Sequence, residues 1–399
     1  MTNVAKAETL ILEHMQMLPS AKRPLGEAIG SVLRENVLAE RDHPPFNRIT
    51  MDGIAIKYVD WERGLRCFRV VGLQGAGVPP ISIVENAECI KIMTGAILPD
   101  GADTIIPIER LTWENENVLV EDTAIVSKGQ YIHPCGSDRI AGSQLLSSGH
   151  LIGPPEMAIL ASAGNSSVRV TVPPRVAIIS TGDELIDVGE KILPYQIRSS
   201  NERAIEASLI HHCQAIVTRV CLKDDPIIIL KAITELHHKN DTVILSGGVS
   251  MGDYDFVPQA LKNLGAKTVF HRIEQRPGRP MWFGISEDHK PIFGLPGNPV
   301  STLVCLTRYV IPALQHAMGL NTRDQEIVRL NKEILFKADL TYFLPVKLSS
   351  NKDGVALANP RPTNTSGDFI SLARTEGFIE LPRGQDRFSE GTSARLFRW

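Results

Sequence analysis

Between residues 175 and 318, short apolar runs rich in β-branched residues alternate with longer segments of helical spacing. The run RVAIIST precedes the helical segment NERAIEASLIHHC, and DPIIILKAITELHH precedes the run DTVILSGG. Such alternation is typical of βαβ units, whose right-handed crossovers make the strands parallel and place helices on both faces of the sheet. Ligands of these sheets bind beyond the carboxyl ends of the strands, so we look for chemistry in the loops that follow the strands.

The length of 399 residues exceeds what one hydrophobic core supports, since single cores stop growing near roughly 250–300 residues. Short β-rich runs separated by turn residues precede and follow the alternating segment. We therefore predict a multidomain α/β plus β fold. Its parts are a discontinuous N-terminal helical and linker domain (1–45 and 130–172), a β-rich insert (46–129), a central βαβ domain with a mostly parallel sheet (173–322) and a small C-terminal β-barrel-like domain (323–399).

The charge balance excludes some classes of partner. Forty-two basic and 45 acidic residues leave a net charge of −3, which argues against generic binding to nucleic acid or to an anionic membrane. No run approaches the roughly 20 apolar residues of a membrane span, and no signal peptide is visible. Six cysteines without a C-x-x-C pair fit a reducing compartment, so we expect a cytoplasmic protein.

A glycine-rich loop, SGGVSMGDYD (246–255), follows a strong predicted strand. Its glycines let backbone N–H groups approach an anion closely, and its serines add hydroxyl donors. Carboxylates at Asp253 and Asp255 suit a magnesium ion beside a phosphate. The alternative interpretation is a plain tight turn. The candidate binding residues of this loop are Ser246, Gly247, Gly248, Ser250 and Gly252.

A second loop, GLPGNPVS (294–301), also follows a β-like run and opens a helix. Asn298 suits the N-cap position and Pro299 the first helical position, which leaves free N–H groups and the positive end of the helix dipole. The alternative is simply a well-capped helix. Because the loop recurs in the same predicted sheet, we expect an edge that binds phosphate or another oxyanion.

Carboxylates follow three predicted strands. Glu184 comes after RVAIIST, Asp224 and Asp225 come after the next strand, and Asp255 ends the first glycine-rich loop. A single acidic residue in such a position is often a helix N-cap, and Asp225 before a proline fits that role. Three strand ends together favour a shared divalent-metal or acid/base site.

The segment HRIEQRPGRP supplies Arg272, Arg276 and Arg279, whose guanidinium groups match tetrahedral oxyanions and phosphates. The alternative is a solvated charged turn. Carboxylates for a cation and arginines for anions, predicted at strand ends of one sheet, indicate phosphoryl or nucleotidyl chemistry in which electrostatics does most of the catalysis.

Two other patterns in the sequence would indicate different chemistry. Residues 248–252 match the G-x-S-x-G nucleophile elbow of serine hydrolases, but the helical pattern starts only near Phe256, several residues too late for an elbow. The pairs His211–His212 and His237–His238 lie near the ends of predicted helices, where complementation of the helix dipole is a commoner role than metal binding. The sequence has no H-E-x-x-H, Walker A or G-x-G-x-x-G motif.

Six segments, taken in order, resemble the molybdopterin molybdenumtransferase family, which includes the C-terminal domain of gephyrin. They are PPFNRITMDG, IMTGA, STGDEL, SGGVSMGDYD, RPGRP and GLPGNPVS. The resemblance implies insertion of molybdate into adenylylated molybdopterin, with Mg²⁺ assisting and AMP released. It also implies a homodimer formed through the N-terminal domain, a βαβ domain that binds molybdopterin, an active cleft completed by the partner chain, and handover of the product to molybdoenzymes or contact with the adenylyltransferase.

The resemblance assigns roles to particular residues. Asp52 and Thr94 would face the cleft from the β-rich insert, and Arg272, Arg276 and Arg279 would hold molybdate and the phosphates. Glu184, Asp225 and Asp255 would hold the magnesium ion. The remaining substrate contacts would come from Ser246, Gly247, Gly248, Ser250, Gly252, Gly278, Pro296, Gly297, Asn298, Ser301 and Ser366.

Two alternatives stay open beside this activity. One is the related adenylyltransferase, although it needs only the βαβ domain, and the MDG and MTGA segments lie outside that domain. The other is a catalytically impaired cofactor-binding or scaffold protein. It rests on arginines in RPGRP, where the family commonly has lysine, and on Pro345, where some members carry arginine.

Overall fold

The computed structural model describes residues 1–247, 261–322 and 324–399, and these residues form two compact units. The first comprises Met1–Glu35, Ser148–Gly153 and Ser167–Trp399, and the second comprises Asn36–Ser147 and Pro154–Ser166. Among the helices of these ranges, none combines the length and the apolar character needed to cross a membrane.

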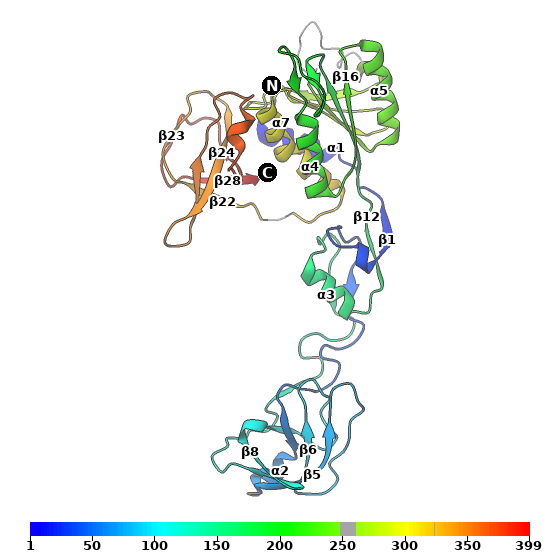
Figure 1. Cartoon of the computed structure of the whole chain (residues 1–399), viewed down its shortest axis with the longest axis vertical. Helices are drawn as coiled ribbons and strands as arrows, with labels where there is room; N and C mark the ends of the chain where they lie inside the picture. The colour runs from blue at the N-terminus through cyan, green and yellow to red at the C-terminus, as the bar shows by residue number, and fades with distance from the viewer. Residues whose placement is uncertain (248–260, 323) are drawn as a thin grey trace. The chain divides into compact units, whose positions relative to one another are not determined.

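A six-stranded sheet of order β16-β13-β17-β21-β20-β18 forms the centre of the first unit. Figure 1 shows its edge strand β16 beside α5. Four strands are parallel, and β18 and β20 add an antiparallel edge, so the predicted mostly parallel sheet is confirmed. The strands are β13 (Arg175–Thr181), β16 (Ile216–Leu222), β17 (Thr242–Ser246), β18 (Lys267–His271), β20 (Trp282–Ile285) and β21 (Pro291–Leu295). Ser180, Ser246 and Leu295 are in register, so the carboxyl ends of β13, β17 and β21 meet at one edge.

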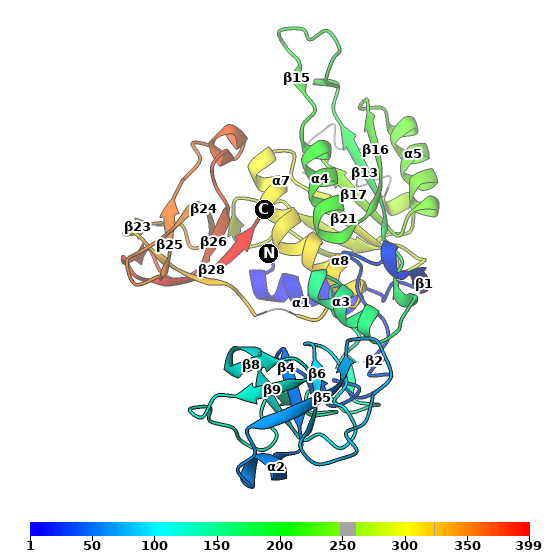
Figure 2. The same ribbon diagram turned by 60° about the horizontal axis from the view of Figure 1, so that its bottom comes forward.

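The apolar run of β13 is buried on both faces because a strand points successive side chains to opposite sides. Val176 and Ile178 join one core with α4 (Asn201–Cys213), whereas Ala177 and Ile179 join another with α5 (Pro226–Lys239). Figure 2 shows these two helices on either side of the sheet. The continuous apolar pattern of the strand therefore follows from helices covering both faces.

Helix α1 (Val4–His14) packs into the same core as α4 through Val4, Ala7 and Ile11. A further helical segment crosses this core as α7 (Pro299–Cys305), a π-helical turn (Leu306–Val310) and α8 (Ile311–Ala317). Every residue of the π-helical turn is buried.

The C-terminal part of the first unit is a small closed barrel, as predicted. Strands pair in the order β24-β25-β22-β28-β26, and β26 pairs back to β24. Strand β19 (Gln275–Arg276) of the α/β part adds to β24. The barrel strands are β22 (Ile327–Leu330), β24 (Thr341–Ser350), β25 (Ala356–Pro360), β26 (Gly377–Leu381) and β28 (Ser393–Arg398), and β23 (Ile334–Leu335) pairs with β27 (Arg387–Phe388). The first unit also contains β1 (Ser20–Pro24), β12 (Ser167–Thr171), β14 (Leu185–Ile186) and β15 (Ile197–Arg198).

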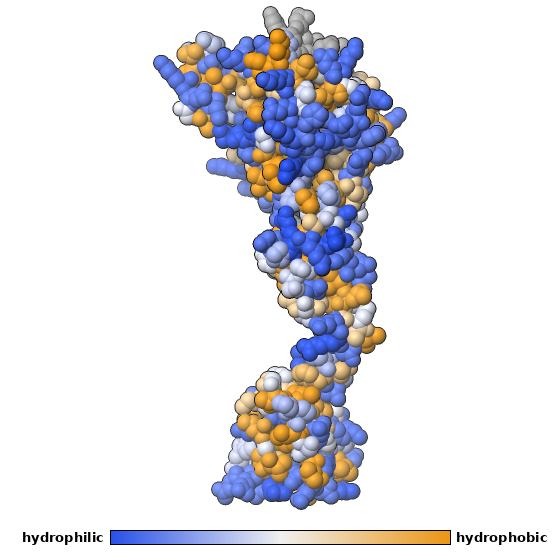
Figure 3. Space-filling model, turned by 90° about the vertical axis from the view of Figure 1, so that its right-hand side faces the viewer, coloured by the Kyte–Doolittle hydropathy of each residue, from blue (hydrophilic) through white to orange (hydrophobic). Residues whose placement is uncertain are grey.

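The second unit is β-rich, as predicted, and has a six-stranded sheet of order β7-β4-β6-β5-β9-β8. Its strands are β4 (Gly53–Ile56), β5 (Cys67–Gln74), β6 (Glu88–Ile92), β7 (Thr104–Pro107), β8 (Leu111–Glu114) and β9 (Asn117–Val120). Smaller elements are β2 (Val37–Leu38), β3 (Arg48–Ile49), α2 (Tyr58–Glu62), β10 (Ile132–His133), β11 (Gln144–Leu146) and α3 (Pro154–Ser162). The unit exposes large apolar side chains such as Leu73, Val78 and Val84, and Figure 3 shows hydrophobic side chains gathered on one face of it.

Arg308, in the π-helical turn, is 1% exposed and connects three segments of the first unit. Its guanidinium donates to the carboxylates of Glu8 in α1 at 2.8 Å and Glu380 in β26 at 3.0 Å, and it lies over the ring of Phe397 in β28. Burial alone would raise the pKa of Glu8, but the bond and the charge of Arg308 hold that pKa below its usual value. A buried charge of this kind is tolerated because it has paired partners.

Replacing Arg308 with methionine is expected to lower the free energy of unfolding of the first unit by about 3–5 kcal/mol, because both carboxylates would then face an apolar side chain. Arg387→Met is the matched control, since its ion pair with Glu333 lies at the surface and contributes little. Urea unfolding followed by circular dichroism measures both variants. An equal decrease in the free energy of unfolding of both variants would contradict a special structural role for Arg308.

Candidate active site

A cavity of about 1140 Å³ lies in the first unit where the strands β13, β17 and β21 end. Its walls come from the loops after these strands, from the RPGRP turn and from the barrel. Most of the binding residues predicted from the sequence line it: Glu184, Ser246, Gly247, Arg276, Gly278, Arg279, Pro296, Gly297, Asn298, Ser301 and Ser366. The structure therefore brings together side chains from segments more than 100 residues apart in the sequence.

The carboxylates at the strand ends are not equivalent. Glu184 and Asp224 line the cavity, and the carboxylate of Glu184 lies back over Gly182, where a Cβ would meet it at 2.7 Å. Asp225 does not line the cavity. Its carboxylate caps α5 and accepts hydrogen bonds from the N–H groups of Ile227 at 2.8 Å and Ile228 at 3.0 Å. Asp225 therefore has the capping role that the following proline favours, and Asp224 is the aspartate of this pair that lines the cavity.

Of the three arginines predicted to bind anions, two line the cavity and one does not. Arg276 and Arg279 are exposed and line the cavity, whereas Arg272 lies outside its lining. Strand β19 places Arg276 opposite Tyr342 of the barrel, so the barrel fixes the backbone of this arginine. The guanidinium of Arg279 contacts the sulfur of Met1 at 3.1 Å.

Gly278, at the centre of RPGRP, has a φ of +91°, a conformation that favours glycine. A Cβ at this position would lie 2.5 Å from the sulfur of Cys305 in α7. The adjacent Gln275 is fully buried, donates to the carbonyl oxygen of Pro277 at 3.1 Å and accepts a hydrogen bond from the hydroxyl of Tyr309. Close packing against α7 therefore determines the backbone conformation of the RPGRP turn.

Asn298 occupies the N-cap position of α7, but its side chain makes no capping bond, which corrects the prediction of a side-chain cap. Its amide donates instead to the hydroxyl of Ser366 in the barrel at 2.7 Å. The N–H of Val300, in the first turn, donates to the carbonyl oxygen of Ser366 at 3.0 Å. The C-terminal part of the chain thus supplies a hydrogen-bond acceptor for one of the free N–H groups at the start of α7. Ser366 lines the cavity together with Asn298.

Asn201 is a cavity residue that the sequence reading did not single out. Its amide donates to the carbonyl oxygen of Gly297 at 2.8 Å and to the hydroxyl of Ser246 at 3.1 Å. It therefore connects the two predicted binding loops. The only signal was the polar run RSSN before a helix, which reads equally well as an ordinary helix start.

Several predicted residues lie elsewhere. Gly248, Ser250, Gly252 and Asp255 fall outside the described residues, as does Asp253. Asp52 and Thr94 belong to the second unit and contact each other. The carboxylate of Asp52 accepts hydrogen bonds from the N–H of Thr94 at 2.6 Å and from its hydroxyl at 2.9 Å, and these bonds lower the pKa of Asp52.

The chain matches three family descriptions in succession. They are the MoeA N-terminal region (domain I and II) over residues 2–164, a probable molybdopterin binding domain over 177–316 and the MoeA C-terminal region (domain IV) over 328–396. The chain thus belongs to a class of multidomain proteins built around an α/β domain described as a probable molybdopterin binding domain.

Similar proteins narrow the class. The chain is 36% identical to a molybdopterin molybdenumtransferase of Synechocystis sp. over the full length of both chains. It is 31% identical to one of Staphylococcus aureus strain Mu50, with 97% of this chain and 93% of the relative covered. A molybdopterin biosynthesis MoeA protein of Pyrococcus horikoshii has a similar structure, with a TM-score of 0.84 at 25% identity and full coverage of both chains. The chain belongs to the molybdopterin molybdenumtransferase family, which confirms the resemblance seen in its motifs.

Substituting Gly278 with alanine is expected to destabilise the first unit by more than the roughly 1–2 kcal/mol that a positive φ costs a residue with a Cβ. The extra loss comes from the contact with Cys305. Gly384→Ala is the matched control, because Gly384 has a φ of +90° and nothing within 4 Å of its added Cβ. Comparing the midpoints of thermal unfolding of the two variants separates the cost of the positive φ, which both share, from the cost of the contact with Cys305. Equal midpoints would show that α7 can move away from the turn without cost.

Proposed function

We propose that this chain transfers molybdenum from molybdate to adenylylated molybdopterin, forming molybdenum cofactor and releasing AMP. The observation that carries the proposal is one cavity that holds both carboxylates and arginines at the carboxyl ends of parallel strands. Relatives that bear the name of this activity match the chain over its whole length. The adenylyltransferase alternative is not favoured, because the likeness extends well beyond the α/β domain.

The cavity suits a large anionic substrate. Small-molecule pockets usually enclose about 300–1,000 Å³, and this cavity is at the upper limit of that range or beyond. The hydroxyl of Ser246 would donate to phosphate oxygens at the end of β17, and Gly247, which has no side chain, would let the substrate approach the backbone closely. Arg276 and Arg279 would hold molybdate, a tetrahedral dianion, through the paired donors of their guanidinium groups.

A magnesium ion fits the donor set of the cavity. Mg²⁺ prefers hard oxygen ligands and is usually bound by one or two carboxylates together with substrate phosphates and water. Glu184 and Asp224 supply carboxylates on the cavity wall, and Asp255, which lies outside the described residues, stays a predicted ligand. When bound, the ion would neutralise charge on the phosphoanhydride.

The chain's own residues would act mainly by positioning. Asn201 would keep Ser246 and Gly297 at a fixed separation, so that both loops meet the same substrate. The link between Asn298 and Ser366 would hold the barrel over the cavity and limit the access of water. Fixed donors aimed at charge that develops during transfer are the largest contribution expected in such chemistry.

We further propose a cytoplasmic homodimer that hands its product to molybdoenzymes or works beside the adenylyltransferase. Asp52 and Thr94 stay predicted active-site residues, and the hydrogen bonds that Asp52 accepts from Thr94 would favour its ionised form. Contact between the copies would involve the predicted N-terminal domain (1–45 and 130–172), where Leu38 and Ile140 expose apolar side chains.

The experiment that tests the function is AMP release from adenylylated molybdopterin by the purified protein, with molybdate and Mg²⁺ each present or omitted. Release that requires both is the expected result. Release without molybdate would indicate simple hydrolysis. Tight binding of the substrate without release would favour the catalytically impaired scaffold instead.

Glu184→Gln is expected to lower the rate of AMP release at least about tenfold, because the amide keeps the shape of the side chain but loses the charge that attracts the cation. Asp225→Asn is the control, since asparagine also caps helices and the structure directs this side chain to α5. The rates are measured over a range of Mg²⁺ concentrations. A larger loss in Asp225→Asn than in Glu184→Gln would reverse the assignment of the carboxylates.

A further inference from the structure

His237, in the last turn of α5, is 3% exposed, and neither nitrogen of its imidazole has a hydrogen-bond partner. Buried polar atoms are almost always bonded, because removing them from water without a partner costs free energy. The side chain continues the buried stripe of Ile229 and Ile233 at a spacing of four residues. An apolar side chain would satisfy that position, so the unpartnered imidazole calls for another explanation.

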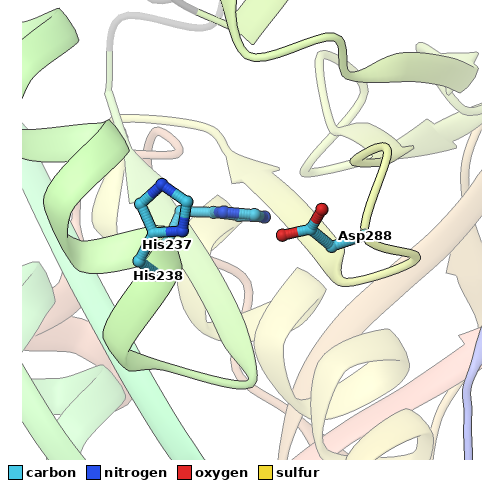
Figure 4. Close-up of side chains that lie close together, drawn as sticks. All are labelled: His237, His238 and Asp288. Carbon is cyan, nitrogen blue, oxygen red and sulfur yellow. The ribbon is translucent and has the colours of Figure 1, made fainter.

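Two further ligand-type side chains lie beside His237. One nitrogen of His237, one of His238 and one carboxylate oxygen of Asp288 all lie within 4.8 Å of one another. The histidines come from the end of α5, and Asp288 comes from the turn between β20 and β21; Figure 4 shows the three side chains close together. Among the residues that the structure describes, this is the group of histidine, cysteine and carboxylate side chains with spacing suited to a metal ion.

The backbone on both sides of the group is already fixed. The ammonium of Lys290 donates to the carbonyl oxygens of His237 at 2.7 Å and His238 at 3.4 Å, which holds the helix end against the turn. The turn itself is closed by the N–H of Ser286, which donates to the carbonyl oxygen of Lys290, and by the N–H of Lys290, which donates to the hydroxyl of Ser286, both at 3.1 Å. The ligands therefore project from segments that binding would not need to order.

The group lies at the amino edge of the parallel sheet. Helix α5 ends just before β17 begins at Thr242, and Asp288 precedes the start of β21 at Pro291. The cavity is at the opposite edge, where these same strands end. The group is therefore separate from the substrate-binding cavity.

We propose that His237, His238 and Asp288 bind one Zn²⁺ ion that clamps the end of α5 to the turn between β20 and β21. Two imidazoles and one carboxylate suit a borderline metal such as zinc rather than Mg²⁺, which prefers oxygen ligands. Zinc–ligand bonds of about 2.0–2.2 Å in a tetrahedron place the ligand atoms about 3.4 Å apart, so the side chains must close slightly on the ion. His238 and Asp288 are exposed and can rotate to do so, and a water molecule would complete the coordination.

The test is calorimetric titration of ZnCl₂ into the full-length protein after removal of metal with a chelator. We expect one ion per chain, and His238→Gln and Asp288→Asn should each weaken its binding at least about tenfold. Both changes are at exposed side chains, so folding is retained without altering the buried His237. Saturating zinc should also raise the midpoint of thermal unfolding of the wild type, but not that of the double variant, which carries both His238→Gln and Asp288→Asn.

His211→Gln combined with His212→Gln is the matched control. This pair also ends a helix, with ring centroids 4.6 Å apart, but within the described ranges it belongs to no such three-ligand group. Zinc binding unchanged by the control and lost in the double variant supports the site. Absence of saturable binding by the wild type, or undiminished binding by the double variant, would overturn it, and neither result depends on AMP release.

Discussion

The buried guanidinium of Arg308 is the contact on which the geometry of the first unit depends. It joins α1, the π-helical turn and the barrel through two carboxylates. The cavity takes its walls from both the α/β part and the barrel, so any shift between them changes the site. A buried ion pair contributes little net stability, but loss of either partner is costly, and it therefore favours one arrangement of the packed parts over others.

Tyr309, the residue after Arg308, helps to position the RPGRP turn. The hydroxyl of Tyr309 donates to Gln275, the residue just before RPGRP, while Cys305, one turn earlier in the helical segment, packs against Gly278. A single helical segment therefore positions both the barrel and the turn that carries Arg276. Its π-helical turn displaces the helix by one residue, and such turns are often found at functional sites.

The sequence was informative where local pattern decides structure. The apolar run of β13 and the helices on either side of it predicted the parallel sheet, and the loops after its strands lead to the cavity. Long-range contacts were not accessible in this way. The proline after Asp225 already favoured a capping role for that residue, whereas nothing local shows that Asn298 bonds to Ser366 rather than to its own helix, because that bond depends on a segment 68 residues away.

The two edges of the central sheet differ in electrostatics for one reason. In a βαβ unit the helices begin near the carboxyl ends of the strands and end near the amino ends. Helix N-termini carry partial positive charge and favour anions, whereas helix C-termini carry partial negative charge and favour cations. The edge at the carboxyl ends of the strands holds the cavity proposed for phosphates and molybdate. At the edge formed by the amino ends, the ammonium of Lys290 donates to the carbonyl oxygen of His237 in the last turn of α5, and the side chains of His237 and His238 lie close to Asp288. The same topology that makes one edge suitable for oxyanions therefore makes the other suitable for a metal cation.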